Sequence, residues 1–149
     1  MSEIFTKSFE VRWDDLDANG HLRNTRYLEY AASARLAFMV TAGWTPKAIH
    51  RAGVAPVTLS DEVRYLREVF PAELVTVSTR VIGLSADVSR WRFEHILTRE
   101  SGETAAEVRT LGAWIDLGIR KIIAPPTELR AVFAAARAAD CQVITSTRL

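Results

Sequence analysis

The sequence has one cysteine, Cys141, among its 149 residues. An intramolecular disulfide is therefore impossible, which fits a reducing compartment. A run of roughly 18 apolar residues, the length that a membrane helix needs, is also missing. The opening MSEIFTKSFEVRW alternates polar and apolar residues where a signal peptide would have a continuous apolar core. We therefore expect a cytoplasmic protein with no membrane segment.

An excess of charge of one sign is absent too. The 19 Lys and Arg residues nearly balance the 18 Asp and Glu residues, for a formal net charge of +1. No long-range field attracts nucleic acid or an anionic membrane, so we expect neither as a partner. What the chain does have is 48% hydrophobic residues, as in an ordinary globular protein. We expect a single domain over residues 1–149, with a core that needs no disulfide or metal.

The pattern of apolar residues predicts both strands and helices. Alternation with a period of two indicates half-buried strands, with a bulge near Gly112 and a hairpin turn at RESGE, Arg99 to Glu103. After the first strand the apolar residues take a helical spacing. Two apolar stripes there predict a mostly enclosed helix capped by Asn24 or Thr25. The expected strands are 5–13, 57–65, 75–81, 90–97 and 104–117; the expected helices are 25–42, a short turn near 45–54, and an alanine-rich 127–139.

Clean alternation means one wet face and one buried face, which favours an antiparallel sheet. The buried face of such a sheet needs a cover, and the helix over residues 25–42 is the element long and apolar enough to provide it. We therefore predict an α+β protein in which the sheet curls around this helix. Five strands leave exposed edges, and pairing across a dimer would bury one of them.

Other side chains with chemical potential have simpler interpretations. His95 lies on the apolar side of its strand, and we expect a hydrogen-bonded core histidine. Cys141 and the residues after it, CQVITSTRL, form a tail that we expect to fray. Four aromatic residues are expected in the core: Trp13, Trp91, Trp114 and Phe93.

A polar cluster, DLDANGH, stands between the first strand and the long helix. Asp17, Asn19 and Gly20 are common turn residues, and a purely structural turn is one interpretation. The other is a site, because a helix N-terminus offers unpaired backbone N–H groups and a partial positive charge. A carboxylate at Asp17, an amide at Asn19 and an imidazole at His21 beside such donors could serve acyl transfer.

The stretch RWDDLDANGHLRNTRYLEY resembles the hotdog-fold acyl thioesterases. It is similar to the DxDxNxHVNN stretch of plant acyl-carrier-protein thioesterases and to the opening of the bacterial 4-hydroxybenzoyl-CoA thioesterase-like group. A looser similarity continues through VRYLREVFPAELVTVSTRV, and Arg23 departs from the plant pattern. The resemblance implies a hotdog fold, a homodimer or homotetramer with interfacial sites, and Asp17 as catalytic carboxylate with Asn19 and His21 as helpers.

The expected activity is hydrolysis of an acyl-CoA, or of an acyl-carrier-protein thioester, without a cofactor or metal. Asp17 could deprotonate water or attack the carbonyl, and both routes stay open. Substrate-binding groups are expected at the start of the helix, where backbone N–H groups would polarise the carbonyl: Asn24, Thr25, Arg26 and Tyr27. Two alternatives remain, a non-catalytic acyl-thioester binding protein and a hotdog-type dehydratase.

Overall fold

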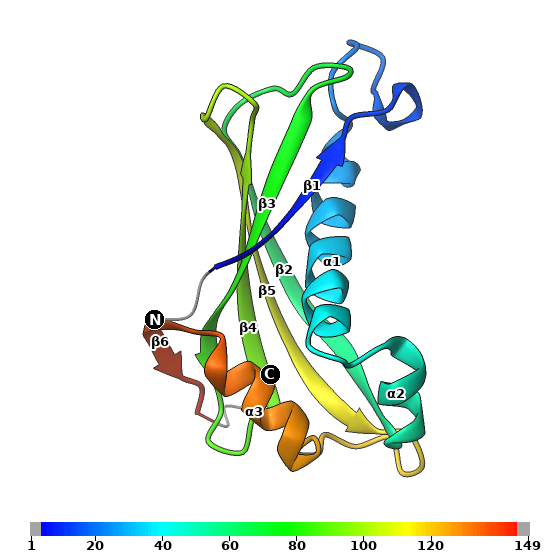
Figure 1. The fold of residues 1–149 in the computed structure, drawn as a ribbon, viewed down its shortest axis with the longest axis vertical. Coiled ribbons are helices and arrows are strands. Elements are labelled where there is room, and N and C mark those ends of the chain that lie inside the picture. Colours follow the sequence, from blue (N-terminus) through cyan, green and yellow to red (C-terminus); the bar gives the residue numbers. More distant parts are fainter. Residues whose placement is uncertain (1–3, 146–149) are drawn as a thin grey trace.

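In the computed structural model, which describes residues 4–145, a curved sheet wraps around one side of a long helix (Figure 1). The strands are β1 (Phe5–Glu10), β2 (Val54–Tyr65), β3 (Leu74–Leu84), β4 (Arg90–Thr98), β5 (Thr104–Asp116) and β6 (Arg137–Val143). The helices are α1 (Asn24–Thr41), α2 (Pro46–Arg51) and α3 (Thr127–Ala135), with a 3-10 turn, η1, at Trp13–Asp15. The predicted α+β hotdog architecture is confirmed.

Five strands form an antiparallel sheet in the order β1-β3-β4-β5-β2, as the alternation of hydrophobic residues predicted. The twelve-residue strand β2 pairs with β5 and forms one edge of this sheet. The turn predicted at RESGE joins β4 to β5, with Arg99 N–H donating to the Glu103 carbonyl. An edge strand of this length leaves a row of backbone groups available for another chain.

The prediction for the C-terminal region was wrong in part. Helix α3 ends at Ala135, and β6 then runs parallel to β3 where residues up to 139 were expected to be helical. Alanine favours a helix, but this intrinsic preference is weak, and pairing with β3 overrides it. Cys141 also lies within β6 instead of a fraying tail, while residues 146–149 lie outside the described part of the chain.

Helix α1 buries one face only. Tyr27, Ala31 and Ala34 pack onto the sheet, whereas Leu36, from the second predicted stripe, and Val40 are each 42% exposed. In a single chain, the prediction of a mostly enclosed helix is therefore correct for one face of α1 and wrong for the other. The predicted caps were also wrong, because Arg23 occupies the N-cap position and no side chain caps the helix there.

Two local predictions need correction. The first strand ends at Glu10, so Trp13 falls in η1, where it is 84% exposed and outside the core. The irregularity expected near Gly112 lies on the facing strand, between Thr58 and Ser60. Gly112 has a different role, since a Cβ there would overlap the ring of Trp91.

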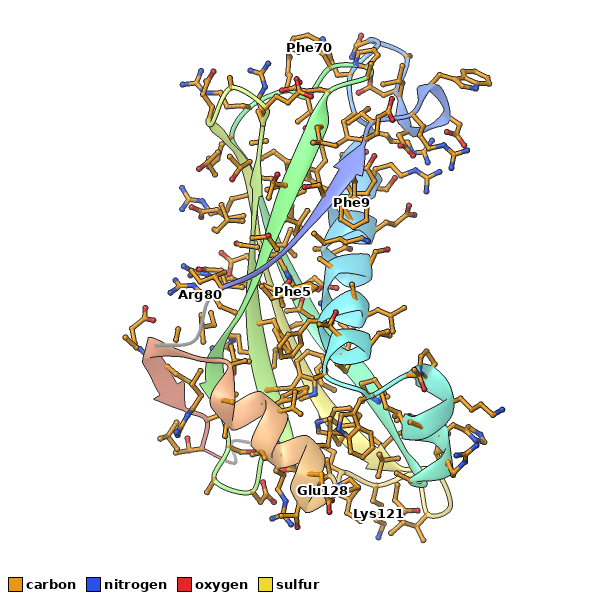
Figure 2. All side chains as sticks on the ribbon, in the orientation of Figure 1. Phe5, Phe9, Phe70, Arg80, Lys121 and Glu128 are labelled. Atoms are coloured by element: carbon orange, nitrogen blue, oxygen red, sulfur yellow. The ribbon has the colours of Figure 1, made fainter. Side chains whose placement is uncertain are left out.

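The core is divided between two ends of α1. Near its first turns the cluster is mainly aliphatic, and Phe9 projects from β1 to stack on Tyr30 (Figure 2). Near its last turns the cluster is aromatic, with Trp91, Trp114 and Phe93 almost fully buried, as predicted. This division places the polar loop and the first turn of α1 at the aliphatic end.

Candidate active site

The loop between β1 and α1 presents Asp17 at the start of the helix. A bridge between Leu16 and Leu22 closes the base of the loop, and Asp17 N–H donates to the carbonyl of His21 at 2.8 Å. The Asp17 carboxylate accepts from the backbone N–H groups of Asn19 (2.9 Å) and His21 (3.2 Å) through Oδ1. Gly20, with φ of 76°, makes the tight return possible. The loop thus fixes an exposed carboxylate without neutralising it.

Asp15 anchors the same loop to the helix. It is 6% exposed, and its carboxylate accepts from the Tyr30 hydroxyl at 2.7 Å and from Arg12 N–H at 2.9 Å. Arg26 Nε lies 3.1 Å from its other oxygen. Burial raises the pKa of Asp15, but the hydrogen bonds from Tyr30 and Arg12 and the charge of Arg26 outweigh it and hold that pKa below 3.8. Asp15 is an ionised structural anchor that the sequence reasoning missed.

A pocket of about 300 Å³ joins the loop, the helix start and the segment after β2. The Tyr65 hydroxyl donates to the Asn24 carbonyl at 2.9 Å, and the Tyr27 hydroxyl donates to the Arg67 carbonyl at 3.3 Å. These two bonds tie the end of β2 to the first turn of α1. The lining residues are Asp17, Asn19, His21, Leu22, Asn24, Tyr27, Tyr65, Leu66, Arg67 and Glu68.

Glu68 is a second acidic group in this pocket. Its Oε2 lies 3.4 Å from Nε2 of His21, and the ring of Phe70 meets the imidazole edge to face at 5.1 Å. Figure 2 shows Phe70 at the end of the molecule where the loop before α1 also lies. Sequence reasoning did not single out Glu68; its one signal was the looser similarity around VRYLREV.

The structure brings five of the seven predicted site residues to the pocket: Asp17, Asn19, His21, Asn24 and Tyr27. Thr25 and Arg26 are not among its lining residues. The Thr25 hydroxyl accepts from Arg23, and Arg26 pairs with Asp15 and Glu29. Their side chains are therefore committed elsewhere, although their backbone belongs to the first turn.

The first turn of α1 retains hydrogen-bond donors. Within residues 4–145, the backbone N–H groups of Asn24 and Thr25 have no acceptor at hydrogen-bond distance, whereas Arg26 N–H is bonded to Arg23. Free N–H groups at a helix start attract an oxyanion. An anion formed beside Asn24 would meet these donors.

Groups of three or more potential metal ligands do not gather anywhere between residues 4 and 145. No described helix combines the length and hydropathy required to cross a bilayer.

A curved antiparallel sheet around a long helix, with a carboxylate loop before that helix, defines the hotdog class of acyl-thioester proteins. The chain belongs to the thioesterase-like superfamily, whose family model matches residues 11–133.

Two relatives and one solved structure illustrate the similarity. The chain is 31% identical, over 78% of its length, to L-carnitine dehydrogenase/betainyl-CoA thioesterase of Agrobacterium fabrum. It is 25% identical, over 84% of its length, to the chloroplastic acyl-acyl carrier protein thioesterase ATL3 of Arabidopsis thaliana. It spans 24% of the first protein and 65% of the second. A Staphylococcus aureus protein solved in complex with CoA shares the fold, with TM-score 0.84, 20% identity, and coverage of 98% of this chain and 90% of that one.

Proposed function

We propose that this protein hydrolyses an acyl-CoA thioester and that Asp17 is the carboxylate that does the chemistry. The observation that carries the proposal is the position of Asp17 in one pocket with Asn24, beside the free N–H groups that begin α1. Family membership supports the reaction class, and the CoA complex of the S. aureus relative supports coenzyme A as the carrier.

In the base route, Asp17 takes a proton from water as the water oxygen attacks the thioester carbonyl. The carbonyl oxygen becomes an oxyanion, which the N–H groups of Asn24 and Thr25 stabilise. The C–S bond then breaks and the thiolate leaves, with His21 placed to return a proton to sulfur. Attack by Asp17 itself, through a mixed anhydride, is the other route. Glu68 holds the imidazole of His21 in either case.

The proposal includes assembly as a homodimer or homotetramer. Support comes from the edge strand β2 and from the exposed side of α1, where Leu36 and Val40 remain in contact with solvent. Tyr65, at the end of β2, lines the pocket, so pairing through β2 would bring a second chain to the site. Native mass spectrometry measures this directly, and a monomer at working concentration would contradict it.

The assay is release of free thiol from a panel of acyl-CoAs with short, medium, long and aromatic acyl groups, run beside matched acyl-carrier-protein thioesters. We expect turnover of at least one acyl-CoA. Tight binding without thiol release would instead favour a non-catalytic acyl-thioester binding protein. Faster turnover of the carrier-protein thioesters would assign the other carrier, the one named for the Arabidopsis relative.

A further inference from the structure

The segment between β2 and β3 carries two side chains that meet the imidazole of His21. Between them lies Val69, which is fully buried and whose carbonyl accepts from Leu22 N–H at 2.8 Å. This bond joins the segment to the loop before α1. Glu68 lies against Nε2 of the imidazole, and the ring of Phe70 meets the imidazole edge to face. His21 is therefore held between a carboxylate and an aromatic ring.

The ring of Phe70 has a second partner, Arg99, in the turn that joins β4 to β5. Phe70 is 42% exposed, so burial alone does not fix the position of its ring. The central carbon of the Arg99 guanidinium lies over this ring, 5.3 Å from its centroid. A cation in such a position is attracted by the electron-rich face of the ring. Contacts with a cation and with an imidazole thus order a side chain that solvent could otherwise reach.

Glu73 holds both the cation and the backbone of Phe70. Its side chain is 10% exposed, Oε1 accepts from Arg99 Nε at 2.9 Å, and Oε2 accepts from Phe70 N–H at 3.0 Å. Burial raises the pKa of Glu73, but these two hydrogen bonds and the charge of Arg99 outweigh it and hold that pKa below 4.5. The carboxylate is therefore ionised at neutral pH, and its two oxygens fix Phe70 through the main chain and through the ring.

This arrangement stands behind the pocket at Asp17 and not in it. The residues that line the pocket include His21 and Glu68 but not Phe70, Glu73 or Arg99. A substrate in the pocket therefore meets the imidazole, whereas the aromatic ring and the ion pair support the imidazole from outside. The contact between Phe70 and His21 joins the two parts.

We propose that Phe70, held by Arg99 and Glu73, is a positioning residue that keeps the His21 imidazole aligned for proton transfer to the leaving sulfur. As the C–S bond breaks, its electron pair goes to sulfur, and sulfur takes a proton from the protonated imidazole, which becomes neutral. An imidazole that rotates freely is seldom aligned for this step. The inference rests on the proposed hydrolysis for the proton transfer, but the positioning itself is measurable without turnover.

The kinetic test compares an acyl-CoA with the S-phenyl thioester of the same acyl group. An aryl thiolate is the weaker base and leaves more readily, so it depends less on a proton donor. In Phe70→Leu we expect kcat for the acyl-CoA to fall about 10- to 100-fold, with KM changed less than about twofold. For the phenyl thioester kcat should change less than about twofold. Phe70→Tyr keeps the ring and should restore wild-type behaviour with both substrates.

A double variant, Glu73→Gln with Arg99→Met, removes the cation but keeps an acceptor for the Phe70 N–H. It also avoids leaving a buried carboxylate without its partner. We expect a loss of kcat of roughly 2- to 5-fold, confined to the acyl-CoA, as for the loss of a cation–π contact. Two controls should behave like wild type. Leu74→Ala removes another apolar side chain that is 42% exposed, and Arg64→Met removes an exposed arginine of another ion pair.

The test without turnover is NMR of the histidine rings, of which the chain has three. In the double variant we expect the His21 ring signals to shift or broaden, because the neighbouring Phe70 ring has lost its cation. The signals of His50, on the exposed surface of α2, should stay in place.

An equal loss of kcat with both thioesters would show that the variants only loosen the fold, and it would overturn the inference. So would an unchanged kcat for the acyl-CoA in folded Phe70→Leu, or His21 signals that the double variant leaves in place. If the wild-type protein hydrolyses no acyl-CoA, the hydrolase proposal fails, and the NMR result alone decides whether Phe70 positions His21.

Discussion

Two aspartates in the loop before α1 stand two residues apart and have opposite environments. Asp15 is buried and receives hydrogen bonds from Tyr30 and Arg12 and an ion pair from Arg26. Asp17 is exposed, lines the pocket, and receives hydrogen bonds only from the backbone of its own loop within the described chain. Asp15, in the first half of the loop, is held by fixed donors, whereas Asp17, in the second half, is exposed to the pocket.

The difference shows how a small domain can place an unsatisfied carboxylate. A carboxylate whose acceptor sites are filled by fixed donors stabilises the fold but has little capacity left for a substrate. Asp15 fixes the loop against Tyr30 of α1, so that Asp17 is exposed but keeps a defined position. Asp15 stabilises the loop in which Asp17 remains exposed. Mutations at the two positions should therefore separate the structural role from the catalytic one.

The largest effect is expected from Asp17→Asn, which keeps an oxygen for the Asn19 and His21 N–H groups but removes the charge. We expect kcat to fall about 100- to 10,000-fold, the usual loss when a general base is removed. The free energy of unfolding should change by less than about 1 kcal/mol, because the residue is exposed. Thiol-release kinetics and urea denaturation of the same preparation measure both.

Asp14→Asn is the matched control for this change, since Asp14 is exposed and its nearest charged partner is Arg12 at 3.6 Å. It should retain activity close to wild type. Full turnover in folded Asp17→Asn would refute the assignment of the catalytic carboxylate.

The opposite profile is expected from Asp15→Ala. Removal of one member of a buried, hydrogen-bonded ion pair typically costs about 3 kcal/mol or more. We expect the urea midpoint to fall accordingly, while kcat measured under folded conditions changes less than in Asp17→Asn. The lowered pKa means that the carboxylate stabilises the fold above pH 3.8 and that this contribution is lost as the pH falls through the native pKa. A variant as stable as wild type at pH 7 would show that Asp15 anchors nothing.

His95 is a buried side chain far from the loop, with its hydrogen bonds satisfied. Its pKa, lowered by burial and by the adjacent Arg35, predicts how the stability of the fold changes with pH. Its folded pKa of about 3 lies below the ordinary value of 6.5, so its neutral form favours folding above pH 6.5 and that advantage is lost as the pH falls toward 3. Between pH 7 and pH 5 we expect a loss of about 2 kcal/mol in the free energy of unfolding. His95→Gln should flatten this dependence, and His50→Gln, on the exposed surface of α2, should not.

Sequence patterns anticipated the parts of this molecule that depend on periodicity and local chemistry. The β4–β5 hairpin at Arg99–Glu103, the burial of His95, and the long helix all followed from spacing and turn residues. Asp17 became a candidate because its motif and the helix start are neighbours in the chain, and the structure places it in the pocket at that helix start.

Other features depend on contacts between distant segments, which periodicity does not encode. Glu68 reaches His21 across 47 positions, and Asp61 faces Thr110 across a strand pair. The alanine-rich stretch after Ala135 becomes a strand because β3 is available beside it. For Asp15, an alternating strand extended to Trp13 gave no reason to expect an inward carboxylate, because the chain instead turns at η1.

The smallest effects are expected at two tyrosines. Tyr30 is bonded to the anchoring Asp15, and Tyr65 lines the pocket. Tyr30→Phe removes the 2.7 Å hydrogen bond to Asp15 but leaves Arg26 and Arg12 in place, so we expect a loss of about 1 to 2 kcal/mol in unfolding free energy. Tyr65→Phe removes the exposed bond to the Asn24 carbonyl, at the mouth of the pocket, and should change stability by less than about 0.5 kcal/mol. Its effect should fall on KM, because the end of β2 then keeps only one of its two bonds to the helix start, the one from Tyr27 to the Arg67 carbonyl. If Tyr65→Phe were the less stable variant and Tyr30→Phe the one with altered KM, the division between an anchoring half and an open half of the loop would be wrong.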